Sequence, residues 1–121
     1  MSTSMPELDE LVASFAQAAA RHYAFTQEGQ RRNINREADK IDELYRRIKG
    51  YGDPGKQGLL KLLGSSDLAV SSMAAAYCMH FAPRECRQAL EAAAKDRGLL
   101  GLEAKYALKR FDDESWRAEF P

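Results

Sequence analysis

The chain is poor in cysteine, in proline and in long apolar runs. Its 121 residues include only two cysteines, too few for a disulfide framework, so a reducing cytoplasm is the expected compartment. The first residues lack both the basic and the apolar region of a signal peptide. No uncharged apolar run approaches the roughly 20 residues that a membrane helix needs. We therefore expect a cytoplasmic protein that does not enter a membrane.

An excess of charge of either sign is also missing. Lys plus Arg total 18 and Asp plus Glu total 18, so the formal net charge is zero. The densest basic features lie near the two ends of one predicted helix: Arg31, Arg32, Arg36, Arg46, Arg47 and Lys49. Acidic residues interleave with them, at Glu37, Asp39, Asp42 and Glu43. This mixture predicts a solvated helix surface, and it disfavours a nucleic-acid partner, which would require excess positive charge.

Apolar residues recur every three to four positions, as they do on the buried faces of helices. The first such pattern begins at Leu8 and predicts a helix that ends near Thr26, ahead of Gly29. A second helix is predicted over about residues 31–49, followed by a glycine-rich turn at 50–55. No segment alternates apolar and polar residues long enough to predict a strand. Together these patterns predict an all-α chain that starts with a helical hairpin at about residues 6–49.

The segment from Leu59 to Phe111 contains one apolar pattern twice, with an offset of 30 residues. Val70 aligns with Leu100, and Ala74 aligns with Ala104. A repeat of this length with helical spacing is typical of stacked helical hairpins. Ser65, Ser66 or Asp67 can cap the helix that contains Val70. Pro83 suits the first turn of the next helix, which is predicted to run to about Arg97, ahead of Gly98.

We expect one domain over residues 1–121, with a first repeat at about 54–81, a second at about 83–111 and a tail at 112–121. In the tail, Trp116 and Phe120 are expected to fold back onto the body, because two free aromatic side chains would be prone to non-specific association. The alternative is that they form a strip that binds a partner.

Two patterns could suggest chemistry, and a simpler interpretation is favoured for each. The series Gly50-x-Gly52-x-x-Gly55 matches the dinucleotide-binding pattern, but it follows a predicted helix rather than a strand, so a turn is expected. Cys78 and His80 stand two residues apart, and on a helix such side chains point roughly 200° away from each other. We expect no metal site and no cofactor there, and Cys78 is interpreted as a small core residue.

No arrangement of residues predicts catalysis, and we expect a protein that is not an enzyme. His22 continues the apolar stripe of the first helix and is interpreted as a packed or partly exposed ring. One alternative remains open, an enzyme that uses Cys78 or Cys86 as a nucleophile. That alternative requires a thiol with a lowered pKa, which the sequence does not reveal.

The series Leu59-Leu-x-Leu-Leu-Gly-Ser-Ser-Asp67-x-x-Val70-x-x-x-Ala74-Ala75 resembles a HEAT-type repeat. The second copy departs from that pattern, with Arg97 and Gly98 near the expected Asp. The whole chain resembles a family of short bacterial HEAT-like proteins of unknown function. This resemblance implies an α-α superhelix of about six helices, arranged as three stacked hairpins, with the second, fourth and sixth helices lining a concave row. The resemblance also suggests the role of an immunity protein, which binds a cognate bacterial toxin and blocks it.

The expected function is therefore a non-catalytic protein-binding module, most specifically an immunity protein that neutralises a cognate toxin. Tyr106 and Met79 lie off the inner apolar stripe of the repeats, which makes them candidate anchors for a partner. For Tyr106 a second interpretation stays open, in which its ring packs against the C-terminal tail. The full set of predicted partner-binding residues is Arg36, Asp39, Glu43, Met79, Tyr106 and Arg110. Two alternatives stay open: a nucleic-acid-binding helical repeat that uses the arginines of the second helix, and a general interaction scaffold.

Overall fold

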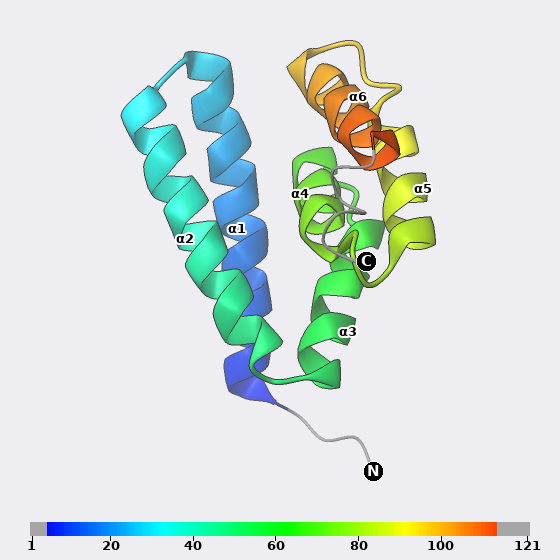
Figure 1. The fold of residues 1–121 in the computed structure, drawn as a ribbon. Coiled ribbons are helices and arrows are strands. Elements are labelled where there is room, and N and C mark those ends of the chain that lie inside the picture. The colour runs from blue at the N-terminus through cyan, green and yellow to red at the C-terminus, as the bar shows by residue number, and fades with distance from the viewer. Residues whose placement is uncertain (1–4, 114–121) are drawn as a thin grey trace. The chain divides into compact units, whose positions relative to one another are not determined.

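The computed structural model describes residues 5–113, and every regular element in that range is a helix (Figure 1). The elements are α1 (Pro6–Glu28), α2 (Arg31–Lys49), α3 (Asp53–Lys61), the short 3-10 helix η1 (Leu62–Gly64), α4 (Leu68–Cys78), α5 (Pro83–Ala93) and α6 (Leu99–Asp112). The prediction of an all-α fold with about six helices is confirmed for the part of the chain that the structure describes. The expected packing of Trp116 and Phe120 concerns residues outside that range.

The chain divides into two compact units, an N-terminal unit (Met1–Leu62) and a C-terminal unit (Leu63–Pro121). The division falls inside the segment 54–81 that the sequence assigns to a first repeat. The stacking of three hairpins into a superhelix therefore stays a prediction. Each unit has its own buried residues and its own turns.

The N-terminal unit is built on the antiparallel pair α1 and α2, which lie side by side (Figure 1). Gly29 ends α1 in the left-handed region, with φ 69°. Its N–H donates to the carbonyl of Thr26 at 3.1 Å, and the next N–H, of Gln30, donates to Phe25 at 3.1 Å. This is the common glycine stop of a helix, and it allows α2 to begin at Arg31. The helix runs two residues past Thr26, where the sequence predicted its end, because Gln27 and Glu28 are compatible with a helix and only Gly29 breaks it.

The seam between these two helices repeats every seven residues. On α1 the buried positions include Leu8, Leu11, Phe15 and Ala18, which are spaced by three, four and three residues. On α2 they are Glu37, Ile41, Leu44 and Ile48, spaced by four, three and four. Such spacing keeps one narrow stripe of each helix facing its neighbour along the whole contact.

The glycine-rich turn after α2 has a conformational explanation. Gly52 adopts φ 70°, a region that side chains disfavour, and α3 begins directly after it with Pro54 in its first turn. Gly55 is buried, and a Cβ built on it would lie 2.0 Å from the carbonyl oxygen of Ile48. The turn between α2 and α3 thus occupies residues 50–52, which is shorter than the predicted 50–55, and Gly55 belongs to α3. Leu59 of α3 lies in the core.

The C-terminal unit is arranged around α4, which contacts both α5 and α6. Asp67 caps α4, since its carboxylate oxygen accepts a hydrogen bond from the N–H of Ala69 at 3.0 Å. The buried positions of α4 cover more than one face, as expected for a short helix without a charged residue. Val70 and Leu100, the aligned pair of the sequence repeat, are both buried, so the prediction of core positions for them is confirmed.

The connection between α5 and α6 is tighter than the sequence predicted. We expected α5 to reach about Arg97, but it ends at Ala93 and a turn follows. A Cβ on Gly101 would lie 1.8 Å from the carbonyl oxygen of Asp96, so the start of α6 lies directly against this turn. The close approach of α6 thus outweighs the helix-favouring sequence Ala-Ala-Ala-Lys95. Further along, Arg87 of α5 stacks over the ring of Phe111 at 4.8 Å and pairs with Asp112.

Replacement of Gly55 by alanine tests the close approach of α3 to α2. We expect Gly55→Ala to lower the free energy of unfolding by about 3 kcal/mol, because the backbone must shift to admit the methyl group. The matched control is Gly64→Ala, where an added Cβ would have no heavy atom within 4 Å. Urea denaturation measures both variants. Equal denaturation midpoints for the two variants would contradict the close packing of α3 against the end of α2.

Candidate functional site

The outer face of α6 carries the exposed apolar side chains. Leu99, Leu102 and Tyr106 are 37%, 47% and 56% exposed, and they are the large hydrophobic residues that lie exposed within the described range. Their spacing of three and four residues places them on one side of the helix. Leu100, Ala104 and Phe111, on the other side, are buried. We call Leu99, Leu102 and Tyr106 the α6 stripe.

Charged side chains border the α6 stripe. The exposed ones on this helix within one turn of Tyr106 are Glu103, Lys105, Lys109 and Arg110. The two cations nearest the C-terminal end also favour the helix itself, since they face the negative end of its dipole. The border is therefore mixed in sign with a surplus of positive charge. An apolar stripe with such a border has the composition of a protein interface, with an aromatic anchor and a charged rim.

The structure distributes the predicted partner-binding residues over both units. Tyr106 belongs to the α6 stripe, and Arg110 follows it by one turn on the same exposed side. Met79 is half-buried at the end of α4. A common surface for these three and the three predicted residues of α2 stays a prediction.

The predicted residues on α2 share one exposed face. Arg36, Asp39 and Glu43 are spaced by three and four residues, and all three are exposed. Arg36 and Asp39 have opposite charges within one turn, an arrangement that typically contributes only a few tenths of a kcal/mol at a helix surface. This face is exposed to a partner, and its charged side chains contribute little to the stability of the helix.

Glu37 corrects the interpretation of α2 as a helix with a wholly solvated acidic face. Its side chain is buried in the seam, with 8% of the residue exposed, rather than placed in solvent with Asp39 and Glu43. Nε of Arg21 lies 3.2 Å from Oε1 of Glu37, and this oxygen accepts no hydrogen bond within the described residues. The seven-residue repeat of the seam was the signal for this position, since Glu37 stands where an aliphatic residue is expected.

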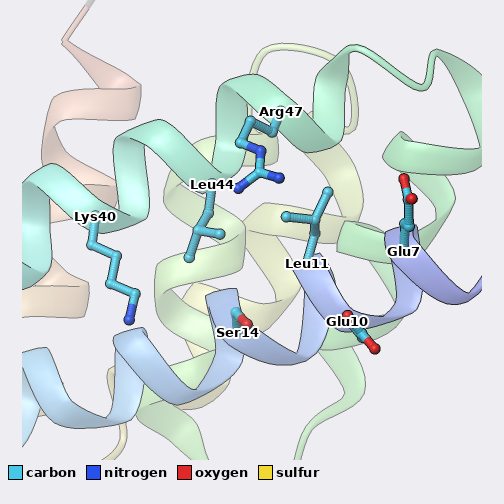
Figure 2. Close-up of a pocket in the computed structure, with 7 residues that line it drawn as sticks. All are labelled: Glu7, Glu10, Leu11, Ser14, Lys40, Leu44 and Arg47. Atoms are coloured by element: carbon cyan, nitrogen blue, oxygen red, sulfur yellow. The ribbon is translucent and has the colours of Figure 1, made fainter.

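A shallow groove of about 520 Å³ lies between α1 and α2 (Figure 2). Leu11 and Leu44, both buried, contribute its apolar part, and the polar lining is Glu7, Glu10, Ser14, Lys40 and Arg47. The carboxylates come from α1 and the cations from α2, so the two walls complement each other in charge. This complementarity favours the pairing of the two helices.

Tyr51 ties the turn after α2 to the beginning of α1. Its hydroxyl donates to a carboxylate oxygen of Glu7 at 3.1 Å. Desolvation, together with this hydrogen bond and the negative charge of Glu7, raises the pKa of Tyr51. The contact links a wall of the groove to the glycine-rich turn, so Glu7 has a structural role.

The two cysteines meet inside the C-terminal unit. Cys78 in α4 and Cys86 in α5 are both fully buried, and their thiols are near enough to influence each other's ionisation. Hydrogen bonding between the two thiols, together with burial, raises the pKa of Cys78, and the same interaction lowers the pKa of Cys86. The interpretation of Cys78 as a core residue is confirmed. Within residues 5–113, no group of three or more His, Cys, Asp and Glu side chains is placed to hold a metal ion.

Comparison with solved structures shows one similar fold. The crystal structure of the protein RPA1889 from Rhodopseudomonas palustris superposes with a TM-score of 0.80 and 24% sequence identity, and the match covers 89% of this chain and 90% of that chain. At this identity the similarity supports the all-α fold and carries no function. No protein-family model matches the chain, and no curated protein sequence matches it. Among the described helices, none has the length and apolarity required to cross a membrane.

A double-mutant cycle measures the ion pair in the seam. Arg21→Met keeps an unbranched apolar side chain but leaves the buried carboxylate of Glu37 without its cation, and we expect a loss of about 1–2 kcal/mol in the free energy of unfolding. In a Glu37→Leu background the same change should be nearly neutral, because no charge remains to be compensated. Chemical denaturation of the four proteins gives the coupling. Additive effects of the two substitutions would show that Arg21 does not stabilise Glu37.

Proposed function

We propose that this protein is a non-catalytic protein-binding module of the cytoplasm. The α6 stripe is the single observation that carries the proposal. Three large apolar side chains at helical spacing stand in solvent, although the same helix has a second apolar side to supply its core contacts. Tyrosine is enriched among the residues that dominate binding energy at protein interfaces. A partner that covers Leu102 and Tyr106 would remove this apolar surface from water.

The more specific proposal is an immunity protein that binds and neutralises a cognate bacterial toxin. It would act by covering the toxin's active cleft or its substrate-binding surface. The resemblance to short bacterial HEAT-like proteins motivates this assignment, and the bacterial source of the similar crystal structure is compatible with it. The mixed charges beside the stripe, and those of Arg36, Asp39 and Glu43 on α2, would supply electrostatic complementarity, which increases the association rate and selects the partner.

We also infer that the segment from Leu59 to Phe111 is a pair of HEAT-like repeats. Several features of the C-terminal unit support this. Asp67 caps α4 at the position where the HEAT pattern has its Asp. The aligned residues Val70 and Leu100 are both buried, and so are Ala74 and Ala104. Small residues at such aligned positions permit close packing of consecutive helices.

Substitutions in the α6 stripe test the binding proposal. The tagged protein, used as bait in extracts of its native host, should retain one protein at near-equal amounts. Leu102→Glu and Tyr106→Ala should each weaken that complex by about ten- to a hundredfold, the range typical of central interface residues. Gln88→Glu, at an exposed position of α5 in the same unit, is the matched control and should bind like the unchanged protein.

The outcomes separate the possible surfaces. Unchanged retention by Leu102→Glu, combined with loss on Glu43→Arg, would move the binding surface to α2. Retention of no protein at all would contradict a binding module.

For the toxin assignment, co-expression with the product of a neighbouring toxin gene should restore growth of the producing cells. A neighbouring toxin that kills equally with and without this protein would contradict the immunity role.

A further inference from the structure

The buried thiol pair is not used by the proposed binding surface. Cys78 is the last residue of α4, and Cys86 is the fourth residue of α5. The two helices pack against each other, both side chains are fully buried, and the two thiols are near enough to influence each other's ionisation. A single buried cysteine is common as a small apolar residue. Two cysteines that interact on neighbouring packed helices form a different arrangement, because proximity of this kind is the first requirement for a bond between their sulfurs.

The surroundings of the pair favour a reaction between the two sulfurs. No third metal-ligating side chain within residues 5–113 joins them, so the pair is a dithiol and not part of a larger cluster. The lowered pKa of Cys86 increases its thiolate fraction, and the thiolate is the form that attacks a disulfide. The intervening turn is short, since the carbonyl of Cys78 accepts hydrogen bonds from the N–H groups of Phe81 and Ala82.

We propose that Cys78 and Cys86 form a reversible intramolecular disulfide, which locks the end of α4 to the beginning of α5. The oxidant is a low-molecular-weight disulfide. Cys86 as thiolate attacks it, a mixed disulfide forms, and one small thiolate leaves. Cys78 then loses its proton and attacks the sulfur of Cys86, so that the Cys78–Cys86 bond forms and the second small thiolate leaves. The protein loses two protons and two electrons, and one oxidant molecule becomes two thiols.

Burial controls the rate of this reaction. Neither sulfur is exposed, so an oxidant gains access only when the connection at residues 79–82 opens locally. Once formed, the bond closes a short loop and restricts the unfolded chain. An increase of about 5–10 °C in the melting temperature is the expected size of this restriction for a domain of this length.

The test uses the full chain and oxidised glutathione. After incubation the protein is denatured, its remaining thiols are alkylated and its intact mass is measured. The expected product is a monomer that has lost two hydrogen atoms and takes up no alkylating groups. Cys78→Ala and Cys86→Ala are the matched controls, and each should keep one alkylatable thiol or carry one glutathione. Because the decisive measurement is made on the unchanged protein, it does not depend on the folding of either variant.

Two results would overturn the proposal. The first is a native protein that keeps both thiols, carries stable glutathione adducts or forms disulfide-linked dimers, under conditions where the urea-unfolded chain forms its internal disulfide completely. The second is a protein that forms the disulfide without any rise in melting temperature. That result would show that the bond does not restrain the end of α4 against the beginning of α5. The supporting result is a higher melting temperature after oxidation, its return on addition of dithiothreitol, and no such response in Cys86→Ala.

Discussion

Two glycines determine how closely consecutive helices approach each other in this protein, because neither carries a side chain. Gly55 is the third residue of α3, and Gly101 is the third residue of α6. An added Cβ would lie 2.0 Å from the carbonyl oxygen of Ile48 in the first case and 1.8 Å from that of Asp96 in the second. In each unit, the start of one helix therefore lies directly against the backbone of the segment that precedes it. The position of Gly101 also fixes the rotation of α6, and hence which of its two apolar sides faces solvent.

Most of the fold was predictable because its signals are local. The periodicity of α2, the cap at Asp67 and the proline at the start of α5 each depend on a few neighbouring residues, and the structure agrees with all three. The end of α5 was predicted incorrectly. Its sequence favours a longer helix, and the early end depends on the approach of Gly101, a contact that no local propensity encodes.

The candidate site was predictable only in part. Periodicity identifies an apolar stripe, but a helix with two stripes, such as α6, does not indicate which one is buried. Tyr106 was found because it departs from the repeat, whereas periodicity alone does not separate the exposed Leu102 from the buried Leu100 of the same helix. Glu37 was misplaced for the opposite reason, since a charged residue in a buried seam position contradicts the usual rule for burial. The contact between Cys78 and Cys86 depends on the geometry of a turn, which spacing alone does not define.

The buried carboxylate of Glu37 has a consequence for alignment. A pair of helices whose contact is wholly aliphatic can slip by one turn with little penalty, since one branched side chain replaces another. Glu37 makes such slippage unfavourable, because at any other height along α1 the negative charge would lose Arg21 and remain desolvated without compensation. One acidic side chain thus selects a single register of the helical hairpin from the several that apolar contacts alone would permit.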